Sequence, residues 1–288
     1  MEQLRQRELR SVRPRHDDPD LPDDVTLNDL DRVARNELKT LSAENAEWVG
    51  RHLAMAARLI EVDPEEAHKH AQSAARRAGR IAVVRETLAI TAYRTGDFAL
   101  ALRELRTFRR IGGSDEQLPL MVDSERGVGR PERALELGRS VPREKLSVGS
   151  QVALAIAMSG ARLDLGQPEL ALGELQISQL DPSVAYSWSP DLFFAYAEVL
   201  DELGRMDESV NWRARAQVAE KALAEANHVG EDETIIVVEE DVEEIPVEIS
   251  DDDVDAAEAF DADARETDDG PAHAAEEEEN DGAASTED

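Results

Sequence analysis

The chain of 288 residues contains no cysteine, which excludes disulfide bonds, thiolate zinc sites and a cysteine nucleophile. Aromatic residues make up only 4% of it. No stretch of about 18 apolar residues occurs, and the arginines near the start are not followed by the apolar run of a secretory signal. These absences predict no membrane segment. The lack of cysteine fits a reducing compartment, so we expect a cytoplasmic protein.

Negative charge is abundant but unevenly placed. The formal net charge is -32, and residues 230–288 alone hold 26 acidic residues against one arginine. We therefore divide the chain into a basic arm (1–26), a helical domain (27–229) and an acidic tail (230–288). The composition of the arm and of the tail predicts disorder at both ends.

A helix-turn-helix pattern recurs along the domain. A turn residue stands five positions before a small residue, first as Val62 with Ala67. The later copies pair Gly96 with Ala101, Gly129 with Ala134, Gly166 with Ala171, and Gly204 with Ser209. A period in this range indicates stacked helical pairs, in which the small residue lets two helix backbones approach each other. Phe98 and Met206, two positions after a turn, are expected to fill the gap between helices.

The apolar spacing predicts one leading helix over 27–41 and then five pairs. The expected pairs are 44–61 with 64–78, 81–95 with 97–111, 115–127 with 131–140, 147–165 with 168–179, and 190–203 with 206–226. Pro119 and Gly127 are expected to weaken the first helix of the third pair.

These residues resemble the tetratricopeptide repeat (TPR) family, and the chain looks like TPR-type proteins of high-GC Gram-positive bacteria. Gly96, Phe98, Ala101 and Leu105 match the family pattern well, whereas Pro131 and Pro168 replace its turn aromatic. The resemblance covers roughly residues 44–226. It implies an all-α fold, a right-handed superhelix of antiparallel helix pairs. The alternative is an irregular helical bundle.

The family binds peptides along the first helices of its pairs, and one subset grips acidic C-termini with Lys and Asn. Here the corresponding slots hold neither residue, so a hydrophobic or amphipathic helical partner suits them better. In the last three pairs these slots are Glu116, Pro119, Leu120, Asp123, Ala153, Ile156, Ala157, Gly160, Asp191, Phe194, Ala195 and Glu198. The candidate groove residues are His52, Ala56, Glu86, Ile90, Tyr93, Ile156, Phe194 and Glu198. Equally, Ile90, Ile156 and Phe194 fit the core between repeats.

Arginines cluster on the second helices. Arg76, Arg77, Arg103, Arg106 and Arg110 form a candidate anion patch for nucleic acid or for the chain's own tail. The simpler interpretation is a solvated face balanced by nearby glutamates.

In the segment TIIVVEEDVEEIPVEI (234–249), a run of β-branched residues is followed by acidic residues. One hypothesis is a strand that adds to another protein's sheet, similar to a SUMO-interacting motif. The other is a disordered stretch that its acids keep soluble.

We found no catalytic motif. Gly127 and Gly129 lack the setting of a phosphate loop. His68 and His70 are two apart on one helix, which predicts solvated side chains on different faces and no metal site. The sequence therefore predicts a non-catalytic scaffold or adaptor for a protein partner, with no cofactor. The alternative is a nucleic-acid- or ribosome-associated factor that uses the arginines.

Overall fold

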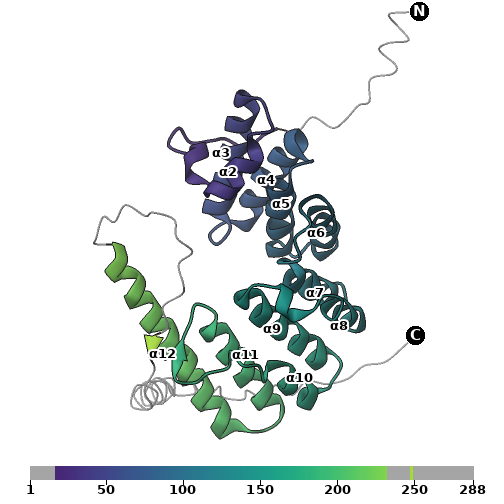
Figure 1. The fold of residues 1–288 in the computed structure, drawn as a ribbon, viewed down its shortest axis with the longest axis vertical. Helices are drawn as coiled ribbons and strands as arrows, with labels where there is room; N and C mark the ends of the chain where they lie inside the picture. Colours follow the sequence, from purple (N-terminus) through teal and green to yellow (C-terminus); the bar gives the residue numbers. More distant parts are fainter. Residues whose placement is uncertain (1–16, 232–246, 249–288) are drawn as a thin grey trace, which may run out of the picture.

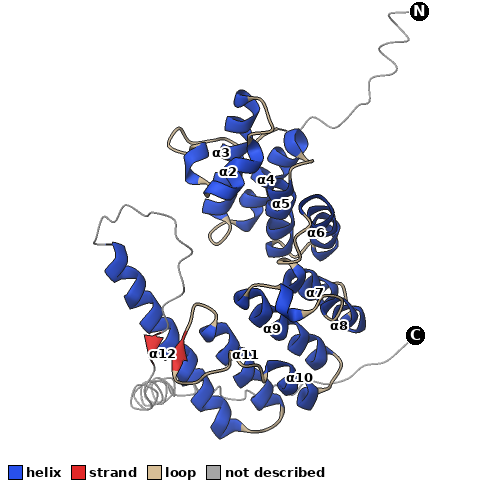
Figure 2. Cartoon of the chain, viewed as in Figure 1, coloured by secondary structure: helices blue, strands red, loops and turns tan. Residues whose placement is uncertain are grey.

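The computed structural model of the chain describes residues 17–231 and 247–248, and the side chains of 17–226. Within these residues lie eleven α-helices, two short 3-10 helices and two two-residue strands (Figures 1 and 2). In chain order the elements are η1 (Leu27–Asp29), α2 (Arg32–Leu38), α3 (Ala43–Leu59), α4 (Pro64–Ala78), α5 (Ala82–Arg94), α6 (Phe98–Gly112), α7 (Leu118–Gly127), α8 (Pro131–Gly138), η2 (Arg143–Lys145), α9 (Val148–Asp164), α10 (Pro168–Leu175), β1 (Val184–Ala185), α11 (Ser189–Glu202), α12 (Met206–Glu231) and β2 (Val247–Glu248).

Each helix from α2 to α12 packs against the next one in the chain. First helices of neighbouring pairs also touch, since α3 contacts α5, α7 contacts α9, and α9 contacts α11. Figure 1 shows the helices following one another from the α3 end to the α12 end. The buried apolar side chains correspondingly form separate clusters along the chain. The all-α class predicted from the sequence is confirmed.

The turns between the two helices of a pair have the geometry that the repeat pattern requires. All four turn glycines have a left-handed φ: 80° at Gly96, 75° at Gly129, 67° at Gly166 and 72° at Gly204. Residues with a Cβ rarely adopt this conformation, so glycine is the natural choice there. The small residue five positions later is fully buried in every copy, namely Ala67, Ala101, Ala134, Ala171 and Ser209.

Side-chain caps explain where several helices begin. Asp63 precedes Pro64 and its carboxylate accepts a hydrogen bond from the backbone N–H of Glu66. Asp97 and Ser147 cap α6 and α9 in the same way. Such caps satisfy N–H groups that have no partner within the helix, and each stabilises its helix by about 1 kcal/mol.

Three local predictions need correction. The single helix expected over 27–41 is divided, because Asp31 caps a new helix through the N–H of Ala34. Pro119 lies in the first turn of α7, where a missing N–H costs nothing, and so does not weaken the helix. Met206 fills no gap, since it is 55% exposed.

The ends of the described region also differ from the expected boundaries. Part of the predicted arm packs on α3: Val25 is buried, and the Arg51 guanidinium donates to the carbonyls of Val25 and Pro22. Of the tail segment 234–249, only β2 is described, and it pairs antiparallel with β1 of the same chain. Helix α12 also runs two residues into the predicted tail, and residues 1–16, 232–246 and 249–288 of the predicted arm and tail lie outside the described residues.

Candidate interaction groove

A cavity of about 410 Å³ opens on the side formed by the first helices of the later pairs. Its apolar walls are Tyr93 of α5, Leu120 of α7, Ile156 of α9 and Phe194 of α11. The residues between these walls include a proline and several alanines, whose small side chains do not fill the space. The other lining residues are Pro119, Asp123, Ala153, Ala157, Asp191, Ala195 and Glu198.

Phe194 is the most unusual member of this lining. Its neighbour Phe193 is fully buried and its ring packs edge-on against Trp212, with 5.2 Å between centroids. Phe194 is instead 48% exposed. A large aromatic side chain left half in water costs free energy that burial against a partner would recover.

One acidic group of the groove is already satisfied within the chain. The Tyr93 hydroxyl donates to Asp123 Oδ2, and Arg126 Nη1 donates to Asp123 Oδ1 at 2.5 Å. Burial, together with the Asp123 carboxylate, raises the pKa of Tyr93 to about 12. This contact therefore fixes the wall between α5 and α7, and the Tyr93 hydroxyl stays protonated.

The other two acids of the groove are exposed. Asp191 and Glu198 stand seven residues apart on α11, on either side of Phe194. Within residues 17–226 neither carboxylate has an ion pair. No lysine or arginine belongs to the lining of the cavity.

Four of the eight groove residues predicted from the sequence line this cavity: Tyr93, Ile156, Phe194 and Glu198. Glu86 and Ile90 are partly buried on α5 but do not line it. Glu86 accepts a hydrogen bond from Gln117 Nε2 at 2.7 Å, and burial raises its pKa.

The placement of His52 and Ala56 in the groove is corrected. Both are buried, with His52 only 1% exposed, because they face the partner helix α4. His52 Nδ1 lies 2.8 Å from His70 Nδ1, so one ring donates and the other accepts. Trp48 packs on the other side of His52, and the Arg77 guanidinium lies 3.6 Å above the Trp48 ring.

The prediction of solvated histidines on α4 is also wrong. His70 is buried, and His68 Nδ1 lies 2.9 Å from the hydroxyl of Thr91 on α5. Burial lowers the pKa of all three histidines, that of His52 to about 4. Single-sequence reasoning missed the pair because its members are 18 residues apart, on helices whose rotation about their axes only packing determines.

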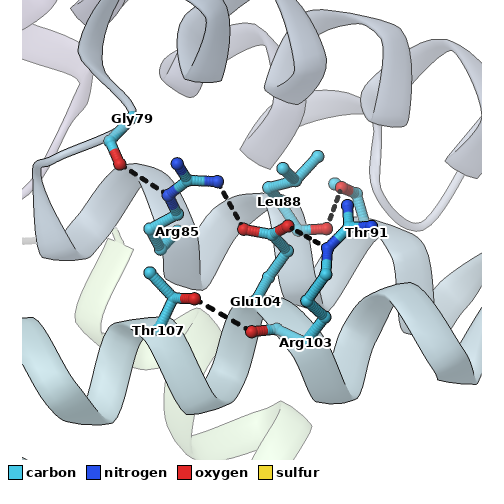
Figure 3. A network of polar contacts seen from close by, with 7 residues as sticks. All are labelled: Gly79, Arg85, Leu88, Thr91, Arg103, Glu104 and Thr107. Carbon is cyan, nitrogen blue, oxygen red and sulfur yellow. Dashed lines mark hydrogen bonds and ion pairs between the residues drawn. The ribbon is translucent and has the colours of Figure 1, made fainter.

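The predicted anion patch is partly neutralised by acids from the interior. Glu104, only 3% exposed, accepts from Arg85 Nη1 at 2.5 Å and from Arg103 Nε at 3.0 Å (Figure 3). Arg85 also donates to the carbonyl of Gly79. Arg103 thus pairs with the buried carboxylate of the next residue on its own helix.

Arg106 behaves similarly toward Glu125, which is 2% exposed, at 2.7 Å. Arg77 stacks on Trp48 as described above. Arg76 and Arg110 are exposed and have no ion pair among the described residues. Two of the five arginines of the predicted patch therefore have no ion pair within residues 17–226.

A second cavity, of about 670 Å³, lies between α11 and α12 and was not predicted from the sequence. It shares Asp191 and Phe194 with the first cavity. It is more polar, since Arg213, Gln217 and Glu220 line it. Phe194 therefore stands between two hollows.

The described residues contain no group of three or more potential metal ligands and no helix long and apolar enough to cross a bilayer. No protein-family model and no curated protein matches the chain.

Proposed function

We propose that this protein is a non-catalytic scaffold or adaptor that binds a segment of another protein in the groove beside α7, α9 and α11. The half-exposed ring of Phe194, which forms one wall of a largely apolar cavity, carries the proposal. Cavities of this size, mostly apolar with a few polar groups, are typical binding sites. Aromatic side chains are the usual anchors of such contacts.

The proposal includes a TPR-like superhelix of antiparallel pairs. It is supported by the left-handed turn glycines, the buried small residues five positions later, and the contacts between successive first helices. Stacked pairs of this kind form extended binding surfaces.

The alternative, a nucleic-acid-associated factor, has less support. Arg103 and Arg106 form ion pairs with the buried carboxylates of Glu104 and Glu125. Phosphate binding would compete with these ion pairs, which help to compensate the buried charges of Glu104 and Glu125.

Selection of peptides from a random display library on the full chain tests the proposal. Peptides recovered on the natural sequence should bind the Phe194→Ser variant at least about tenfold more weakly, because an apolar anchor has lost its partner. Leu170→Ser is the matched control. Leu170 is 52% exposed on the second helix α10, outside both cavities.

The measured quantity is the Kd of each recovered peptide by fluorescence anisotropy. Equal affinity for the natural chain and for Phe194→Ser would refute the groove as the binding site. Loss of affinity with Leu170→Ser would place binding on the opposite helices.

A further inference from the structure

The groove combines an apolar centre with negative charge and lacks positive charge. From this we infer that its partner is a cationic amphipathic helix, with an apolar residue that packs on Phe194 and two Lys or Arg residues that meet Asp191 and Glu198. The inference rests on the proposed function, since it names the chemistry of the segment that the groove binds.

The first observation is the sign of the charges. Three acids and no base line the 410 Å³ cavity. Asp123 is occupied by Tyr93 and Arg126, which leaves Asp191 and Glu198 available to a partner. An acidic partner would bring like charges together at this rim, which disfavours it, whereas a cationic one is attracted.

The second observation is the spacing. Seven residues of helix separate Asp191 from Glu198, a rise of about 10 Å along α11. Phe194 and Ala195 lie between them on the same face, because residues three, four and seven apart share one side of a helix. A partner helix with two basic residues seven positions apart and an apolar residue between them matches this stripe.

The third observation separates these two acids by their surroundings. Asp191 is in the first turn of α11, where the helix dipole stabilises a carboxylate without any partner. Glu198 lies beyond the first turn of the helix, where the dipole gives no such stabilisation. It is exposed and has no ion pair within residues 17–226. Glu198 is therefore expected to contribute more to the choice of partner than Asp191.

The experiment must distinguish these two carboxylates from the general negative charge of a chain whose net charge is -32. Three synthetic helical peptides share one leucine-rich centre and differ only at two flanking positions, which carry Lys, Ser or Glu. Anisotropy gives the Kd of each for the full chain at about 50 mM and about 150 mM salt.

On the natural chain, the Lys peptide is expected to bind at least about tenfold more tightly than the Glu peptide at low salt. The double variant Asp191→Asn/Glu198→Gln should weaken the Lys peptide by about fivefold to tenfold and leave the Ser peptide unchanged. The matched control is Glu47→Gln/Glu136→Gln, which removes the same charge from exposed positions outside both cavities. It should change neither Kd by more than about twofold.

The outcomes separate the two levels of inference. If Phe194→Ser weakens all three peptides but the Lys preference survives in the double variant, the groove binds a segment and the cationic assignment is wrong. If Phe194→Ser affects none of them, the proposed function itself fails. A natural chain that sediments as a dimer, and as a monomer when Phe194 is Ser, would show a second copy in the groove and would overturn the cationic partner.

Discussion

The earlier pairs, α3 to α6, and the later ones, α7 to α12, place different side chains between neighbouring helices. In the earlier pairs, polar groups are buried and paired: His52 with His70, and Glu104 with Arg85 and Arg103. In the later pairs, the first helices carry small apolar residues such as Ala153 and Ala157, and a cavity remains between them.

The difference concerns what fills the space between neighbouring helices. Buried hydrogen-bonded groups fix one arrangement of neighbouring helices but leave no free surface. Small residues beside an exposed aromatic leave room for a ligand at a cost in packing. Under the proposed function, the earlier pairs hold neighbouring helices in place and the later pairs bind the partner.

The largest change in the free energy of unfolding is expected on α11, where Phe193 is buried and the adjacent Phe194 is half exposed. Phe193→Ala should lower the free energy of unfolding by about 3–5 kcal/mol, because the residue is fully buried against Trp212. Phe194→Ala should change it by less than about 1 kcal/mol, because the ring is already half in water. Urea unfolding followed by circular dichroism measures both. Similar losses for the two variants would mean that Phe194 belongs to the core.

A pH effect is expected from the histidines of the earlier pairs. The pKa of His52 falls from 6.5 to about 4 on folding, so below pH 6.5 the unfolded chain binds a proton that the folded chain refuses. The free energy of unfolding that depends on neutral His52 is fully present above pH 6.5. It decreases by on the order of 3 kcal/mol as the pH falls toward about 4. Burial lowers the pKa of His70 and His68 too, which adds to the same trend.

Unfolding of the natural chain and of His52→Gln between about pH 7 and pH 4 checks this expectation. Glutamine can still hydrogen-bond to His70 but does not titrate, so the variant should lose a large part of the slope. An unchanged slope would assign the pH dependence to other groups.

Removal of Glu104, which lies in the earlier pairs, should cost more than removal of the less buried Glu174 in the later ones. Glu104→Ala leaves Arg85 without its carboxylate and should lower the free energy of unfolding by about 2–3 kcal/mol. The side chain of Glu174 is 15% exposed, against 4% for Glu104, so its carboxylate is better solvated and Glu174→Ala should cost about 1 kcal/mol. The same unfolding assay compares them, and the reverse order would contradict the polar support assigned to the earlier pairs.

The sequence predicted the features that neighbouring residues determine. Helix α4 begins and ends where expected, because Asp63 and Pro64 start it and its apolar spacing is local. The groove slots of α7, α9 and α11 follow from the same register, since a turn glycine fixes which face each helix presents. By contrast, the partners of His52 and Glu104 depend on how two helices are rotated against each other, which no local pattern contains. For that reason a histidine expected in the groove lies in the interior.

The smallest effects concern the junction of the two regions, where Phe98 of α6 packs on Gly127 of α7. A Cβ at Gly127 would lie 2.4 Å from the Phe98 ring, whereas one at the exposed helical Gly173 would meet nothing within 4 Å. Both positions are helical, so alanine gains about 0.5–1 kcal/mol from backbone entropy at each. At Gly127 the overlap with the ring outweighs this gain, and Gly127→Ala should destabilise by about 1 kcal/mol while Gly173→Ala stabilises by about 0.5 kcal/mol. Opposite shifts in urea midpoint would show that close packing of Phe98 on α7 joins the two regions, and a stabilised Gly127→Ala variant would show that they meet loosely.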